Sequence, residues 1–239
     1  MSTAARSGTN RPRAALQVFL VAAVLLVFIA LGEAAGSGAR ALSPRDIAQG
    51  VGLGGAILLG GVAALLAVFR EPWSTLGFRR EAPAAVLSWG LLGLVACYVV
   101  AGAGTVLYAL AAGLAPERLA AEKAAALGGF SALPPPVILP LALFTGVYEE
   151  LVFRGFFLSR LRAALSADPR SRAAAACAVA LSSALFAAGH FYQSTLGVVQ
   201  TFAVGLVLGA LAVRRDNVWP CVVAHAGINL IGLTALRFA

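Results

Sequence analysis

Long apolar stretches recur along the whole chain, separated by short segments that hold most of the charged residues. A helix needs about 20 residues to cross the hydrocarbon of a bilayer, so 239 residues can hold about seven spans with short loops. Apolar residues make up 60% of the chain and charged residues 12%, whereas soluble domains have about 45–50% and 25%. This is too little polar surface to cover a water-soluble globule. We therefore expect an all-α fold, a polytopic bundle of about seven transmembrane helices.

This composition excludes a soluble enzyme, a disordered regulator, a disulfide-stapled secreted domain and a nucleic-acid binder. The net charge of +8 comes from 18 basic and 10 acidic residues. Because the basic residues lie in short segments between apolar stretches, we interpret them as signals for topology and contacts with lipid headgroups. Cys97, Cys177 and Cys221 are isolated in apolar surroundings, which is typical of small core residues.

The apolar stretches predict spans at about 14–31, 47–69, 84–114, 137–160, 173–190, 196–213 and 219–236. Residues 115–135 predict a loop with a short surface helix. The first stretch is 18 residues long, longer than the apolar core of a signal peptide, about 7–15 residues. We expect a retained helix there, with a cleaved signal peptide as the alternative. The chain then divides into a cytoplasmic tail (1–13), N-terminal transmembrane helices and a loop (14–135), and a catalytic transmembrane core (136–239).

The basic residues between the spans predict the orientation. With the N-terminus inside, the inner segments hold 12 basic residues and the outer segments hold five, namely Arg40, Arg45, Arg118, Lys123 and Arg237. This asymmetry favours a cytoplasmic N-terminus and an external C-terminus. The chain has a single lysine and many alanines, which favours a bacterial, GC-rich source and hence a bacterial cell membrane.

Three charged residues lie in the middle of a predicted span: Glu149, Glu150 and Arg154. An ionisable group at that depth costs on the order of 2.5–3.5 kcal/mol and is a functional hypothesis by default. Residues four apart share a helix face, so Glu150 and Arg154 can pair, whereas Glu149 points elsewhere and has no partner within the helix. Such a carboxylate could act as a general base. The alternative is an ion pair that only locks two helices together.

Both histidines of the chain, His190 and His225, also lie within or at the end of predicted spans. Each has a companion on the same helix face, Phe186 and Asn229 respectively. Asn229 is an uncharged donor that could stabilise an oxyanion together with a histidine. A base, its electrostatic support and hydrogen-bond donors together suit amide hydrolysis inside a membrane.

Counting residues from the basic flanks gives different depths for these groups. Glu149 lies roughly 16 Å deep, His225 roughly 9 Å and His190 roughly 24 Å. A common site therefore requires tilted or broken helices, or a fifth span that begins elsewhere.

Three short motifs in this region resemble those of a known family. The sequence EELVFRG at 149–155 is similar to EExxxR, FAAGH at 186–190 to FxxxH, and HAGIN at 225–229 to HxxxN. In this order they resemble the CPBP family of intramembrane proteases, which includes the type II CAAX prenyl endopeptidases and the bacterial Abi proteins. The resemblance covers about residues 137–236. It implies that Glu149 activates water, that Glu150 and Arg154 support Glu149, that His190 positions the water, and that His225 and Asn229 stabilise the oxyanion.

The cofactor requirement has two readings. Glu149, His190 and His225 could form a zinc site with an open position. There is no HExxH motif, however, and Asn229 is a better oxyanion donor than zinc ligand. We therefore expect a metal-independent mechanism.

The expected partners are membrane lipid and a membrane-associated peptide or protein substrate, CAAX-like or of the bacteriocin type, and no nucleic acid. Two other functions use the same residues. An ion- or proton-coupled transporter also places Glu, Arg and His in its spans, although it usually has repeated halves. A non-catalytic scaffold could bind partners through the same cavity.

Overall fold

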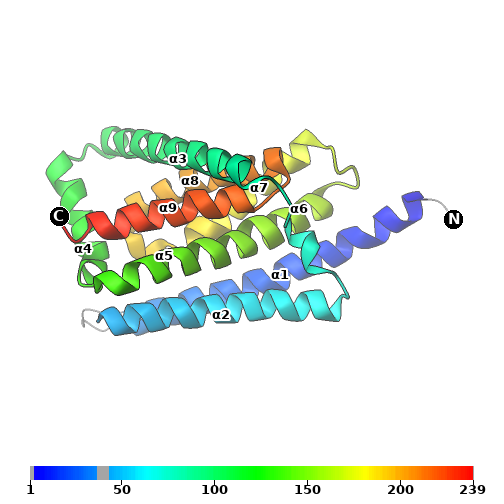
Figure 1. The fold of residues 1–239 in the computed structure, drawn as a ribbon, viewed down its shortest axis with the longest axis horizontal. Coiled ribbons are helices and arrows are strands. Elements are labelled where there is room, and N and C mark those ends of the chain that lie inside the picture. Colours follow the sequence, from blue (N-terminus) through cyan, green and yellow to red (C-terminus); the bar gives the residue numbers. More distant parts are fainter. Residues whose placement is uncertain (1–2, 37–42, 239) are drawn as a thin grey trace.

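The computed structural model describes residues 3–36 and 43–238, and these residues form a bundle of helices (Figure 1). In chain order the elements are α1 (Thr3–Gly36), α2 (Pro44–Val68), the 3-10 turn η1 (Trp73–Leu76), α3 (Pro83–Ala112), α4 (Pro116–Ser131), α5 (Pro135–Glu150), the π-helical segment η2 (Leu151–Phe157), α6 (Leu158–Leu165), α7 (Arg172–Ala188), the 3-10 turn η3 (Phe191–Gln193), α8 (Ser194–Arg215) and α9 (Trp219–Ala235). The predicted all-α architecture is confirmed.

Proline marks the first turn of many of these helices, including α2, α3, α4, α5 and α9. Proline fits there because the first backbone N–H groups of a helix have no partner within it. At α2 the preceding Ser43 and Asp46 also form a reciprocal capping box. These local signals place the helix starts within a few residues of the predicted spans.

Among the described residues, four helical segments are long and apolar enough to cross a membrane: Pro44–Val68, Pro83–Ala112, Pro135–Leu165 and Phe191–Arg215. The apolar helices α7 and α9 are shorter. The chain thus has the architecture of an integral membrane protein, and the count of seven spans stays a prediction.

The first helix begins earlier than expected. We predicted a polar tail over residues 1–13, but α1 begins at Thr3. Contacts with neighbouring segments explain the longer helix: Arg11 donates to the carbonyl of Ala164, and Arg13 forms an ion pair with Glu71. That this segment is cytoplasmic stays a prediction. Residues 1–2 of the tail and Arg40 lie outside the described residues.

The segments predicted to face the cytoplasm gather at one end of the bundle. Figure 1 shows the ends of α2, α6 and α8 at the same end as the N-terminus, while α4 and the C-terminus lie at the other. The two groups of loops inferred from the basic residues are therefore separated along the bundle axis, as the predicted topology requires.

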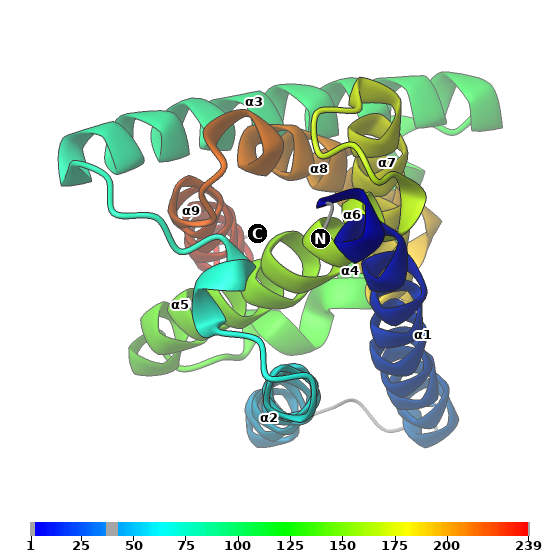
Figure 2. The same cartoon turned by 90° about the vertical axis from the view of Figure 1, so that its right-hand side faces the viewer.

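The continuous helix formed by α5, η2 and α6 runs through the middle of the bundle, between α9, α2, α1 and α7 (Figure 2). Every residue of η2 is buried. Glycines allow the neighbouring segments to approach closely: a Cβ on Gly146 would lie 2.8 Å from the backbone nitrogen of Ala226 in α9, and one on Gly155 would lie 2.9 Å from the carbonyl oxygen of Leu76. The residues singled out in 149–154 consequently occupy the centre of the molecule.

Candidate active site

The two adjacent glutamates lie where α5 passes into the π-helical segment η2, and π-helical turns occur often at functional sites. Glu149 is 8% exposed and Glu150 is fully buried. The Arg154 Nη1 atom lies 2.7 Å from Glu150 Oε1, so the pairing predicted from their spacing is present. The Arg154 guanidinium also stacks over the Phe186 ring, 4.4 Å from its centroid. The buried charge of Arg154 is therefore stabilised by an ion pair with Glu150 and by a cation–π contact with Phe186.

Both histidines have their Nδ1 atoms engaged by oxygen atoms. His225 Nδ1 lies 2.7 Å from Glu150 Oε1, and His190 Nδ1 lies 2.8 Å from the carbonyl oxygen of Phe186. A carbonyl oxygen and an arginine-paired carboxylate can only accept, so each Nδ1 must carry the proton. In the neutral rings the remaining Nε2 atoms are then hydrogen-bond acceptors.

These two Nε2 atoms converge on Glu149. Its Oε2 atom lies 3.5 Å from His225 Nε2 and 3.9 Å from His190 Nε2. It is buried and has no hydrogen-bond partner in the protein. Three acceptor atoms facing one point need a donor between them or a proton on one of the rings. The structure thus brings together Glu149, His190 and His225, at the spot where a water molecule could be held and deprotonated.

The same three residues are those proposed for zinc. Histidine ligands of metals usually donate their other ring nitrogen to a carbonyl or a carboxylate, as both rings do in this protein. The donor types therefore suit zinc. Their spacing does not match a preformed site, because the described part of the chain contains no group of three His, Cys, Asp or Glu side chains arranged to hold a metal ion.

Asn229 lies one helical turn from this point. Its side-chain nitrogen donates to Thr145 Oγ1 at 2.8 Å. Thr145 precedes Glu149 by four residues, so the two share one face of α5. Asn229 therefore contacts the face of α5 that carries Glu149, about one helical turn away from Glu149, and its role as an oxyanion donor stays a prediction.

Aromatic residues surround the site, and sequence reasoning identified only one of them, Phe186. The Tyr148 hydroxyl donates to Glu149 Oε1 at 2.9 Å, so the prediction that Glu149 has no partner within its helix is wrong. Neighbouring side chains diverge by about 100°, but the long tyrosine side chain reaches back to the next residue. Tyr192 stacks on His190, with ring centroids 5.8 Å apart, and on Phe130 of α4. Phe186 contacts the rings of both histidines. Only Phe186 had a sequence signal, its place in the FxxxH motif.

The structure brings Glu149, His190 and His225 together although their counted depths differ. The start of α9 packs inside the protein: Val218, just before α9, is only 2% exposed, and its N–H donates to the carbonyl of Gly77 behind η1. His190 follows the end of α7, in the turn that leads to η3.

The fold and the site define a helical membrane protein with a buried carboxylate–imidazole centre. Residues 131–231 match the family model of the type II CAAX prenyl endopeptidases, Rce1-like. This segment contains all six residues singled out from the sequence. The resemblance to the CPBP and CAAX proteases is therefore confirmed over this part of the chain. No curated protein and no solved structure matches the chain.

Proposed function

We propose that this protein is an intramembrane endopeptidase in which Glu149 activates a water molecule to hydrolyse a peptide bond. The observation that carries the proposal is the convergence of His190 Nε2 and His225 Nε2 on the unpartnered Oε2 of Glu149. A water molecule at this point would donate one hydrogen to the carboxylate oxygen of Glu149 and the other to the Nε2 of one neutral imidazole, which leaves a lone pair of its oxygen free to attack. The match of residues 131–231 to the Rce1-like type II CAAX prenyl endopeptidase model supports peptidase chemistry at this point.

In this mechanism Glu149 takes a proton from the water as its oxygen bonds to the carbonyl carbon of the substrate. The carbonyl oxygen becomes an oxyanion, and the amide of Asn229 is the nearby neutral donor for it. His225 could donate from Nε2 only as an imidazolium, which Glu150 at 2.7 Å would stabilise. The C–N bond then breaks, the proton held by Glu149 passes to the leaving amine, and Glu149 returns to its ionised form.

Glu150, Arg154 and Tyr148 act as positioning residues. Glu150 holds His225 in one tautomer through Nδ1, and Arg154 donates a hydrogen bond to the same oxygen of Glu150. Tyr148 holds the other oxygen of Glu149, which leaves Oε2 directed toward the histidines. The proposed substrate is a membrane-associated peptide, CAAX-like or of the bacteriocin type, and the proposed location is a bacterial cell membrane with the N-terminus in the cytoplasm.

The test compares cells that express the wild-type chain, Glu149→Gln, or the control Glu117→Gln, which changes an exposed acid on α4. New peptide C-termini in the membrane fraction should occur with wild type and the control and be absent with Glu149→Gln. Identical peptide patterns in all three strains would contradict the proposal. Proton flux in proteoliposomes that is lost on Glu149→Gln would favour a transporter, and full biological activity of that variant would favour a scaffold.

A further inference from the structure

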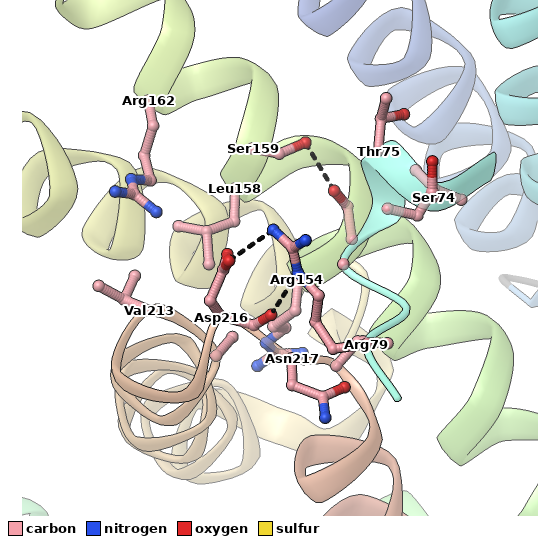
Figure 3. Close-up of a pocket in the computed structure, with 15 residues that line it drawn as sticks. Ser74, Thr75, Arg79, Arg154, Leu158, Ser159, Arg162, Val213, Asp216 and Asn217 are labelled. Carbon is pink, nitrogen blue, oxygen red and sulfur yellow. Dashed lines mark hydrogen bonds and ion pairs between the residues drawn. The ribbon is translucent and has the colours of Figure 1, made fainter. Parts of the chain in front are cut away.

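A cavity with polar lining residues lies at the end of the bundle that carries the basic segments. It has a volume of about 130 Å³ and lies between η1, α6 and the connection from α8 to α9 (Figure 3). Hydroxyl, amide and guanidinium groups line it, contributed by Ser74, Thr75, Arg79, Ser159, Arg162 and Asn217. None of these residues belongs to the proposed catalytic centre.

The wall of this cavity has an excess of positive charge. Arg79 forms an ion pair with Asp216, with 2.6 Å between Nη2 and Oδ2, while its Nη1 has no partner in the described residues. Arg162 donates from Nη2 to the carbonyl oxygen of Pro169 and has no ion pair there. Arg154 also borders the cavity, but Glu150 compensates its charge. Arg162 is thus an unpaired cation beside guanidinium N–H groups that remain free.

The surroundings indicate the level of the lipid headgroups. Among the described residues, the segments at this end carry 12 basic and four acidic residues, whereas those at the opposite end carry four of each. All three tryptophans of the chain lie near this end, on η1, near the start of α3 and at the start of α9. Trp73 and Trp219 are partly exposed. Tryptophan is enriched at the membrane–water interface, so the cavity opens where phosphate groups of lipids lie.

We propose that this cavity binds the phosphate group of an anionic lipid headgroup. A guanidinium presents its N–H groups in a planar fork that matches two phosphate oxygens, and such charge-assisted bonds are about twice as strong as neutral ones. Basic pockets between transmembrane helices suit anionic lipids for this reason. Arg162 and Arg79 would hold the phosphate, because both side chains line the cavity. Asp216 does not prevent binding, because Arg79 neutralises it.

The test measures phosphatidylglycerol binding to the full-length protein in detergent by native mass spectrometry. The pocket variant is Arg79→Gln/Arg162→Gln, and the matched control is Arg170→Gln/Arg172→Gln, which removes the same charge from exposed residues outside the cavity. We expect the pocket variant to bind at least about tenfold more weakly, because it loses charge-assisted bonds. The control should stay within about twofold of wild type. Phosphatidylcholine, which has no net charge, should bind more weakly to wild type than phosphatidylglycerol.

Three results would overturn the proposal. The first is an unchanged affinity of the pocket variant for phosphatidylglycerol. The second is an equal loss of affinity in the control variant, which would indicate diffuse electrostatic attraction, and the third is inorganic phosphate that binds as tightly as the lipid. If the double variant fails to fold, Arg162→Gln alone keeps the ion pair between Arg79 and Asp216 and provides the same comparison. Because the readout is binding, it is independent of whether the chain cleaves peptides.

Discussion

One oxygen of the Glu150 carboxylate accepts hydrogen bonds from two side chains. Replacing Glu150 should therefore lower the stability of the protein more than replacing Glu149, the proposed base. Arg154 Nη1 and His225 Nδ1 both lie 2.7 Å from Glu150 Oε1, and Glu150 is fully buried. Glu150→Gln keeps the shape and one oxygen acceptor but removes the negative charge. The guanidinium of Arg154 would then be buried without a counter-charge.

The expected loss follows from that uncompensated charge. Breaking a buried ion pair by removing one partner costs about 3–5 kcal/mol of the free energy of unfolding. Glu149 has no ion pair with an arginine or lysine among the described residues, and the glutamine of Glu149→Gln keeps an oxygen that can accept from Tyr148, so this change should cost no more than about 1 kcal/mol. Replacing both partners, in Glu150→Gln/Arg154→Met, should recover part of the loss, with a coupling energy of about 0.5–3 kcal/mol.

The assay is reversible unfolding in mixed micelles, with the free energy of unfolding compared among wild type and the three variants. The reasoning predicts the order wild type, Glu149→Gln, double variant, Glu150→Gln from most to least stable. It is refuted if Glu150→Gln unfolds as easily as Glu149→Gln does, because Arg154 would then not depend on Glu150.

Further predictions concern orientation of the base, packing, pH and metal. Tyr148→Phe should lower kcat by about tenfold with KM unchanged, because the hydroxyl orients Glu149 without contacting substrate; an equal rise in KM would contradict this. Gly146→Ala should cost about 1–3 kcal/mol in unfolding experiments, because its methyl group meets the backbone of α9, whereas the control Gly102→Ala has open space and should cost nothing. Hydrogen bonds from Asn217 and Arg215 lower the pKa of Glu81 below 4.5. The stability that Glu81 contributes is therefore present above pH 4.5 and is lost as pH falls through the lowered pKa. The unfolding temperature of Glu81→Gln should consequently fall less than that of wild type when the pH is lowered through this range. Dialysis against a strong chelator should leave the cleavage rate unchanged; a loss that zinc restores would contradict the metal-independent reading.

The sequence was sufficient for features that depend on local spacing. The pairing of Glu150 with Arg154 follows from the helical repeat and is present at 2.7 Å, even though a π-helical segment begins at Leu151. The helical class follows from the length and apolarity of the stretches. Both predictions follow from periodicity and composition, which can be measured on a single sequence.

Features that depend on tertiary arrangement were not accessible in this way. Nothing in the chain before α9 indicates that Val218 lies inside the bundle against Gly77. The tautomers of His190 and His225 depend on acceptors set by the fold. The hydroxyl of Tyr148 reaches Glu149 only because the tyrosine side chain turns along the helix, which spacing rules do not describe.

The most direct test of the central claim is the rate at which purified, reconstituted protein cleaves a membrane peptide identified from the cellular comparison. Loss of the general base should lower the rate of Glu149→Gln by about 10²–10⁴-fold, while Glu117→Gln cleaves at the wild-type rate and both variants unfold close to wild type. Wild-type cleavage by a folded Glu149→Gln protein would contradict the assignment of Glu149 as the base.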